Sequence, residues 1–144
     1  MDKFLFLSLI IITACNQTKN HNKMDEKLVI AHRGASGYLP EHTMESKAMA
    51  YAMNPDFIEQ DLVLSKDDVP IVIHDIYLDD VTNVAAKFTD RKRKDNRYYV
   101  IDFTFDELKT LKVSERFDPK NGEQVYKSRF PKGKGNFKIH SFSE

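Results

Sequence analysis

The sequence contains little cysteine and no excess of charge of either sign. Cys15 is the only cysteine among 144 residues, so the chain can form no intrachain disulfide bond. The 22 lysine and arginine residues balance 22 aspartate and glutamate residues, and this zero net charge argues against a general nucleic-acid binder. With 41% hydrophobic residues and a mass of 16.7 kDa, the chain has the composition of one small globular domain.

The sequence also lacks an apolar run long enough to cross a bilayer as a helix. The mostly apolar run Phe4 to Ile12 follows Lys3 and is too short to span a membrane. A short apolar run of this kind near the N-terminus is typical of a signal peptide, which we expect to cover residues 1–14.

Cys15 ends a short motif that gives it a role. Ile12-Thr13-Ala14-Cys15 is similar to the lipobox of bacterial lipoproteins, which implies that Cys15 becomes the lipid-bearing first residue. The alternative is an ordinary secretory signal with an incidental cysteine. Residues 15–27 are polar and are expected to form a flexible tether. The sequence therefore predicts a protein of the bacterial cell envelope, lipid-anchored to a membrane and facing the periplasm or the surface.

Strand and helix patterns alternate after the tether, which indicates an α/β fold. We expect strands at Leu28–Ala31, Phe57–Leu64 and Pro70–Ile73, and helices at Met44–Met53 and Phe105–Val113 with Thr43 and Thr104 as their N-caps. Asp68 is expected to take the left-handed position in the turn between the second and third strands.

Two long segments carry polar and turn residues without a clear period. Residues 79–99 contain a basic cluster, which is interpreted as part of a solvated loop in preference to a nucleic-acid patch. Residues 116–136 contain Asp-Pro, Asn-Gly and Pro-Lys-Gly sequences and are expected to be irregular.

Two carboxylates interrupt the apolar stretch Phe57–Leu64. Strand side chains alternate between faces, so Glu59 and Asp61 share one face, with Cα atoms about 6.6 Å apart. On an enclosed face these like charges repel each other unless a cation lies between them, and Mg²⁺ and Ca²⁺ prefer carboxylate oxygens. The pattern thus predicts a divalent-metal site. The alternative is a half-exposed strand whose polar face happens to be acidic.

Two of the predicted strands end in histidine. His32 follows Ala31, and His74 follows Ile73 and precedes Asp75. Because histidine titrates near neutrality, either ring can donate or accept a proton in catalysis. Two strands that both end in histidine indicate one shared site.

Four short motifs resemble one enzyme family. Ala31-His32-Arg33-Gly34, Pro40-Glu41-His42-Thr43, Glu59-Gln60-Asp61 and His74-Asp75 are similar, in this order and spacing, to the N-terminal half of glycerophosphodiester phosphodiesterases of the secreted or lipoprotein type. The resemblance covers residues 28–144, which we expect to form one domain. It implies a (β/α)₈ TIM barrel of the phospholipase C-like phosphodiesterase type, with its site at the carboxyl ends of the strands.

The resemblance also implies roles for individual side chains. His32 and His74 would be the catalytic acid/base pair, Arg33 and Glu41 would contact the substrate, and Glu59 and Asp61 would bind Ca²⁺ or Mg²⁺. A guanidinium suits a phosphate group because its planar fork of donors matches two oxygens. For Asp75 two readings stay open: it orients His74, or it simply turns the chain. The remaining histidines, His21, His42 and His140, are interpreted as structural or solvated.

The implied activity is metal-dependent hydrolysis of glycerophosphodiesters to sn-glycerol 3-phosphate and an alcohol. One alternative is a non-catalytic surface lipoprotein with a binding or adhesive role, or a decayed remnant on the same fold. Another is a phospholipase relative that attacks intact lipid. The expected partners are a small glycerophosphodiester substrate and the membrane, and no nucleic acid.

A TIM barrel needs about 250 residues, so we expect this 144-residue chain to hold only the N-terminal portion of one. The family's Pro-Glu-Ile-Lys-like segment, which supplies a third carboxylate ligand, has no counterpart in the sequence. The alcohol pocket is expected to be formed mostly by absent loops. Choline, ethanolamine, glycerol and inositol head groups therefore all stay open.

Overall fold

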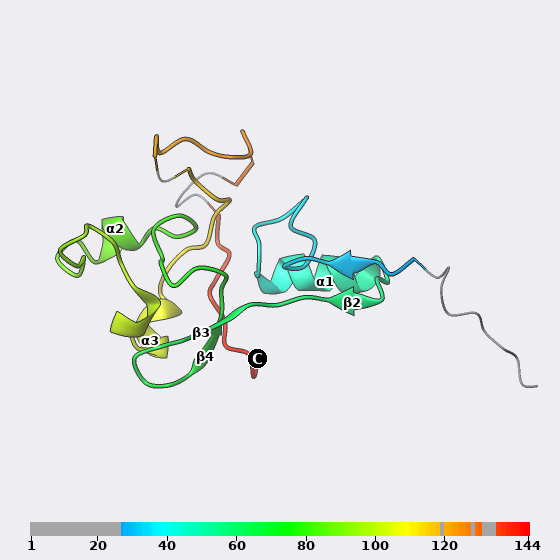
Figure 1. Ribbon diagram of the computed structural model, residues 1–144, viewed down its shortest axis with the longest axis horizontal. Helices are drawn as coiled ribbons and strands as arrows, with labels where there is room; N and C mark the ends of the chain where they lie inside the picture. Colours follow the sequence, from blue (N-terminus) through cyan, green and yellow to red (C-terminus); the bar gives the residue numbers. More distant parts are fainter. Residues whose placement is uncertain (1–26, 119, 128, 131–134) are drawn as a thin grey trace, which may run out of the picture.

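The computed structural model describes residues 27–118, 120–127, 129–130 and 135–144 (Figure 1). The predicted signal peptide, Cys15, His21 and all but the last residue of the predicted tether lie outside this part of the chain. Among the residues that are described, none belongs to a helix both long and apolar enough to cross a membrane.

One end of the molecule is a strand–helix–strand unit. β1 (Ile30–Ala31) and β2 (Phe57–Ile58) pair in parallel, and α1 (Met44–Ala52) connects them. The Thr43 side chain accepts a hydrogen bond from the backbone N–H of Ser46 at 3.2 Å, so the predicted N-cap is confirmed. The helix ends one residue before its predicted end. This unit brings the ends of β1 and β2 to the same edge of a sheet.

The predicted strand Phe57–Leu64 is wrong as a single strand. The chain leaves β2 and enters a different sheet as β3 (Leu62–Leu64), which pairs antiparallel with β4 (Pro70–Val72). The backbone N–H of Glu59 still donates to the last carbonyl of β1 (3.0 Å), whereas the Asp61 carbonyl accepts from the residue after β4 (3.2 Å). Residues 59–61 thus join two sheets, because long-range pairing outweighs the local alternation.

The hairpin β3–β4 has the turn that the sequence predicts. Asp68 has a φ of 59°, in the left-handed region. On its other side, β4 contacts the C-terminal residues through an isolated antiparallel bridge between Ile71 and Ser141. In Figure 1 this last segment, in red, passes close to the hairpin.

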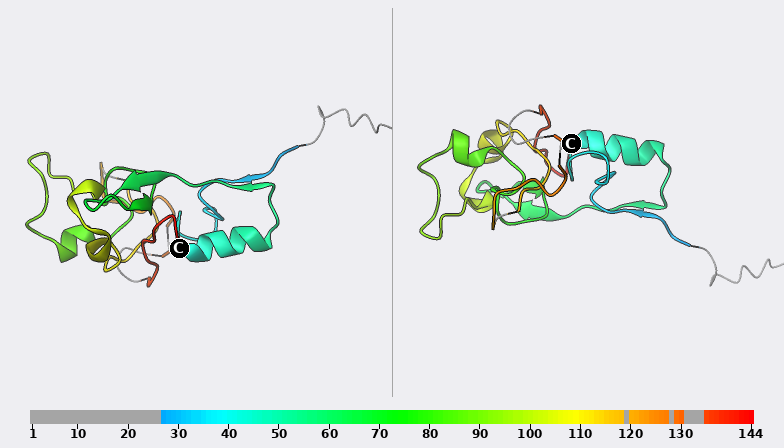
Figure 2. Two further views of the ribbon diagram at one scale, coloured as in Figure 1. Left: turned by 90° about the horizontal axis from the view of Figure 1, so that it is seen from below. Right: turned by 90° about the horizontal axis from the view of Figure 1, so that it is seen from above.

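The other end of the molecule packs three short helices near the hairpin. They are α2 (Val84–Lys87), η1 (Val100–Asp102) and α3 (Phe105–Leu108), and both views of Figure 2 place them at the end opposite to α1. The fully buried core between these helices and the hairpin comprises Ile71, Leu78, Val84, Val100, Phe103, Leu108 and Leu111. α3 is shorter than predicted, but Thr104 is its N-cap and forms a capping box with Glu107.

The basic cluster in residues 79–99 lies in a loop and is mostly exposed, as predicted, but its arginines have partners within the chain. Three arginines bind carboxylates: Arg91 binds Glu107 (2.9 Å), Arg93 binds Asp102 (2.7 Å) and Arg97 binds Asp80 (3.2 Å). The Arg93 and Arg97 guanidiniums also lie over the rings of Tyr99 and Tyr77, 3.9 and 4.1 Å from their centroids. These contacts pair the three arginines with carboxylates of the chain, whereas Lys92 and Lys94 are exposed to solvent.

The two small sheets form a partial α/β arrangement and do not close into a barrel within the described ranges. Apolar side chains of β1 and β2 remain exposed, with Ile30 at 57% and Phe57 at 58%. On α1, Tyr51 is exposed, while the small residues Ser46 and Ala50 are buried.

Candidate active site

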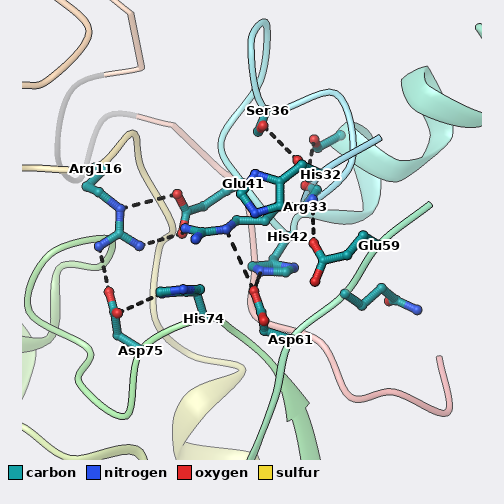
Figure 3. A network of polar contacts seen from close by, with 12 residues as sticks. His32, Arg33, Ser36, Glu41, His42, Glu59, Asp61, His74, Asp75 and Arg116 are labelled. Atoms are coloured by element: carbon teal, nitrogen blue, oxygen red, sulfur yellow. Dashed lines mark hydrogen bonds and ion pairs between the residues drawn. The ribbon is translucent and has the colours of Figure 1, made fainter. Parts of the chain in front are cut away.

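Ionisable side chains collect where the strands end. His32 follows β1 and Glu59 follows β2, and because these strands are parallel, both residues leave the sheet at the same edge. The hydrogen bond from Ile73 to the Asp61 carbonyl brings the chain before His74 to the same place. Figure 3 shows these side chains around the guanidinium of Arg33.

The loop after β1 has a sharp backbone turn that positions Arg33. Arg33 and Gly34 both have positive φ angles, 59° and 84°. A Cβ atom on Gly34 would lie 2.6 Å from Oγ and 3.0 Å from the carbonyl carbon of Ser46 in α1. The turn therefore needs glycine both for its conformation and for its close approach to the helix.

Arg33 lies among three carboxylates. Its backbone N–H donates to Oε2 of Glu59 (3.0 Å), its Nη1 donates to Oε1 of Glu41 (3.1 Å), and its Nε lies 3.7 Å from Oδ2 of Asp61. This Nε is buried and has no hydrogen-bond partner among the described residues. A buried, partly unsatisfied guanidinium at the edge of a pocket is suited to bind an anion such as phosphate.

Glu59 and Asp61 both contact Arg33 although they do not share a strand: Glu59 accepts from its backbone N–H, and Asp61 lies beside its guanidinium. Both are carboxylates, the hard oxygen donors that Mg²⁺ and Ca²⁺ prefer, so the donor chemistry fits such an ion. No group of three or more His, Cys, Asp or Glu side chains with metal-site geometry occurs in the part of the chain that the structure describes. Glu59 and Asp61 thus offer two carboxylate ligands to such an ion.

His42 and His140 are buried and linked to each other. Nε2 of His42 donates to Oδ2 of Asp61 at 3.1 Å, since a carboxylate can only accept. The His42 carbonyl oxygen in turn lies 2.7 Å from Nε2 of His140. Burial lowers the pKa of His42, although Asp61 opposes this effect. His42 is therefore a buried histidine, and its ring also fixes the carboxylate of Asp61, one of the two predicted metal ligands.

A second chain of contacts leads away from His74. Nδ1 of His74 lies 2.7 Å from Oδ1 of Asp75, and Oδ2 of Asp75 accepts from Nη1 of Arg116 at 2.5 Å. Arg116 also binds Glu41 through two nitrogens, at 2.5 and 3.3 Å. Two roles were left open for Asp75: it orients His74, or it simply turns the chain. The contact between its carboxylate and the His74 ring favours the first role.

Electrostatics favour the charged forms of this network. Burial alone would raise the pKa of Glu41 and of Asp75, but hydrogen bonds from Arg116 outweigh it and hold both pKa values below normal. Burial would lower the pKa of Arg116, but its two carboxylate partners outweigh that effect and raise it. Glu41 is thus the shared acceptor of two guanidiniums, those of Arg33 and Arg116.

Sequence reasoning missed Arg116, which lies in the segment predicted to be irregular. Arg116 lies 75 positions after Glu41 and 41 positions after Asp75 in the sequence. No local periodicity or short motif carries such a pairing. The one signal in the sequence is an isolated arginine in a chain whose site has an excess of carboxylates.

An open pocket of about 200 Å³ lies between His32 and Arg33 on one side and Arg116 and Tyr126 on the other. Glu41 also lines this pocket. Glu115, Arg116, Val125 and Tyr126, from the segment predicted to be irregular or next to it, also line this pocket.

Comparison with known proteins places these residues in one family. The sequence model of the glycerophosphoryl diester phosphodiesterase family matches residues 32–143. A glycerophosphodiester phosphodiesterase of Haemophilus influenzae is 50% identical over 99% of this chain and 42% of its own length. One from Treponema pallidum is 46% identical over 83% of this chain and 34% of its own length. This chain thus spans less than half the length of these curated relatives.

Solved structures show the same likeness. A glycerophosphodiester phosphodiesterase from Agrobacterium tumefaciens matches 81% of this chain and 40% of its own, with a TM-score of 0.57 and 26% identity. A glycerophosphoryl diester phosphodiesterase from Parabacteroides distasonis matches 83% of this chain and 34% of its own, with a TM-score of 0.52 and 23% identity, which supports the fold alone. The enzymes of this kind are TIM barrels, and the partial α/β arrangement is consistent with an incomplete barrel.

Proposed function

This chain belongs to the glycerophosphoryl diester phosphodiesterase family, and on that premise we propose that its site hydrolyses glycerophosphodiesters to sn-glycerol 3-phosphate and an alcohol. The observation that carries the proposal is the position of Arg33 among Glu41, Glu59 and Asp61, with a buried Nε that has no hydrogen-bond partner among the described residues. In the view of Figure 3 the rings of His32 and His74 lie on either side of this guanidinium.

In the proposed mechanism, His32 and His74 move the protons. One ring takes a proton from the attacking hydroxyl, and the other gives a proton to the departing alkoxide of the alcohol. The attacking hydroxyl belongs either to water, which gives sn-glycerol 3-phosphate directly, or to the neighbouring glycerol carbon, which gives a cyclic phosphate that water then opens. Asp75 accepts a hydrogen bond from Nδ1–H of His74, which leaves Nε2 of this ring for proton transfer. Arg33 binds phosphate oxygens and stabilises the negative charge on these oxygens during the displacement.

We propose that Glu59 and Asp61 hold a divalent cation, Ca²⁺ or Mg²⁺, as two of its ligands. When bound, such an ion would neutralise phosphate charge beside Arg33. His42 supports this role because its hydrogen bond to Oδ2 fixes the Asp61 carboxylate. In this arrangement Glu41 acts mainly on Arg33 and Arg116 and lines the substrate pocket.

The position in the cell is proposed from the sequence alone. The apolar run Phe4–Ile12 followed by Thr13-Ala14-Cys15 supports export and acylation of Cys15, and hence a lipid-anchored protein of the secreted or lipoprotein type in the bacterial envelope. Such an anchor would hold the site near a source of deacylated phospholipids. The polar stretch from residue 15 to residue 27 would then separate the membrane from β1.

The activity is tested by incubating the chain with glycerophosphocholine, glycerophosphoethanolamine, glycerophosphoglycerol and glycerophosphoinositol. We expect release of sn-glycerol 3-phosphate that stops when EDTA removes divalent ions and returns when Ca²⁺ or Mg²⁺ is added. A folded chain that binds these compounds without releasing glycerol 3-phosphate would instead support the non-catalytic binding role. Release of the head-group alcohol from intact phospholipid vesicles, with phosphatidic acid left in the bilayer, would support a phospholipase.

A further inference from the structure

We propose that Arg116 is a positioning residue that fixes the orientation and tautomer of the His74 imidazole through Asp75. The inference rests on the proposed function, in which His74 transfers a proton. It concerns a residue outside the four motifs, in the segment between α3 and the C-terminal residues. The contacts that carry it are Arg116 to Asp75 at 2.5 Å and Asp75 to His74 at 2.7 Å.

The backbone presents Arg116 from a fixed place. On the two sides of this residue, the N–H of Ser114 donates to the Val81 carbonyl (2.9 Å) and the N–H of Phe117 donates to the Asp80 carbonyl (2.8 Å). The Arg116 carbonyl itself accepts from the N–H of Val125 at 3.0 Å. A side chain that starts from a backbone held at three points loses little further entropy when it orders.

The guanidinium is held in its plane by Glu41. Nε and Nη2 bind the two oxygens of this carboxylate as a fork, at 3.3 and 2.5 Å, which leaves Nη1 directed at Asp75. With two carboxylates already bound, Arg116 is a poor candidate for a second phosphate-binding cation. Its net effect falls on Asp75 and, through it, on His74.

The consequence for His74 is chemical. A carboxylate only accepts, so Nδ1 of His74 must carry the proton in this contact, and Nε2 of the neutral ring is the acceptor. The Asp75 side chain is 23% exposed, so without Arg116 it can rotate toward water. The ring would then sample both tautomers, and only one of them presents an unprotonated Nε2.

A purely structural Arg116 would make a different prediction. It would stabilise the fold by joining residues 41, 75 and 116 but leave the tautomer of His74 unchanged. The two roles are separated by ring nitrogen chemical shifts in the ¹⁵N-labelled 144-residue chain, recorded at about pH 9, where histidine rings are neutral.

In the wild-type chain we expect His74 to be protonated at Nδ1. In Arg116→Met, with circular dichroism like that of the wild type, we expect the proton to move largely to Nε2. Arg93→Met is the matched control, because it also removes a guanidinium that binds a carboxylate, Asp102, but at the other end of the molecule. A folded Arg116→Met chain that keeps the Nδ1 proton overturns the proposal.

Turnover gives a second readout. If the chain hydrolyses glycerophosphocholine, Arg116→Met should lower kcat by about 10- to 100-fold, as loss of a supporting contact typically does, with little change in KM. A change in KM alone would mean that Arg116 binds substrate, which contradicts the positioning role. If the wild-type chain has no activity, the proposed function fails, and the tautomer still decides the role of Arg116.

A measurement on the wild-type chain covers the case in which Arg116→Met does not fold. Two bound carboxylates should restrict rotation of the Arg116 guanidinium about Nε–Cζ and give separate, slowly exchanging Nη proton signals. A single averaged signal, like that of an exposed arginine, would show that Arg116 does not hold Asp75 and would overturn the proposal.

Discussion

The backbone N–H of Arg33 donates to the Glu59 carboxylate at 3.0 Å, which ties the loop after β1 to the residue that follows β2. One oxygen of Glu59 is thus used to shape the loop that carries the phosphate-binding candidate. The same side chain is a predicted metal ligand. Structural and metal-binding roles of Glu59 can be separated because an amide keeps an acceptor oxygen but loses the charge.

Glu59→Gln should therefore weaken metal binding while it preserves the fold. We expect affinity for Ca²⁺ or Mg²⁺, measured by calorimetry on the 144-residue chain, to fall by at least about tenfold, because a hard cation depends on carboxylate charge. Glu45→Gln, an exposed substitution in the first turn of α1, is the control and should bind as the wild type does. Equal affinities for Glu59→Gln and the wild type would remove Glu59 from the site.

Gly34→Ala should destabilise the chain by at least about 2 kcal/mol, since alanine at positive φ is strained and its Cβ would lie too close to Ser46. Urea unfolding measures the change. Gly37→Ala is the matched control in the same loop, because a Cβ there meets nothing within 4 Å. It should be neutral or slightly stabilising. Similar losses of stability for both variants would contradict the close packing of the loop on α1.

Acid should destabilise the chain through Glu41 and Asp75. Burial would raise their pKa values, but hydrogen bonds from Arg116 hold them below the ordinary 4.5 and 3.8, so their stabilising effect is complete above about pH 4.5. It is lost as the pH falls through the lowered values of the folded state. Arg116→Met should flatten this dependence of the unfolding free energy on pH. The exposed Lys94→Met should keep the slope of the wild type, and an unchanged slope in Arg116→Met would contradict the electrostatic account.

Cys15→Ser should release the protein from the membrane or leave the precursor uncleaved. One acyl chain binds a membrane only marginally, whereas two or more, at about 0.8 kcal/mol per buried CH₂, bind it stably. Metabolic labelling with palmitate and fractionation of cells measure the change. A Cys15→Ser protein that stays labelled and membrane-bound would show that another residue is the anchor.

Local hydrogen bonding explains which elements could be predicted. The N-caps at Thr43 and Thr104 and the left-handed turn at Asp68 depend on residues at most three positions away, and all three are present. The short motifs likewise placed His32, Arg33 and Glu59 at the ends of two predicted strands. These ends lie next to each other because parallel pairing of β1 and β2 follows from the strand–helix–strand order.

The features that could not be predicted depend on distant partners. The predicted strand Phe57–Leu64 divides into β2 and β3 because β2 pairs with β1 and β3 pairs with β4. The alternation of side chains along the sequence does not indicate this division. Arg116 finds Glu41 from 75 positions away, and the basic cluster pairs with carboxylates on η1 and α3. Each of these contacts needs the folded chain before it can be recognised.

The central claim, that His32 and His74 act together on a phosphodiester, is tested most directly by a double-variant cycle. Release of sn-glycerol 3-phosphate from glycerophosphocholine is measured for His32→Ala, His74→Ala, the double variant and the control His21→Ala, with folding checked by circular dichroism. We predict that each single variant loses about 10²- to 10⁴-fold in kcat, that the double variant loses little more, and that His21→Ala keeps full activity. Full turnover by folded His74→Ala protein would contradict the account.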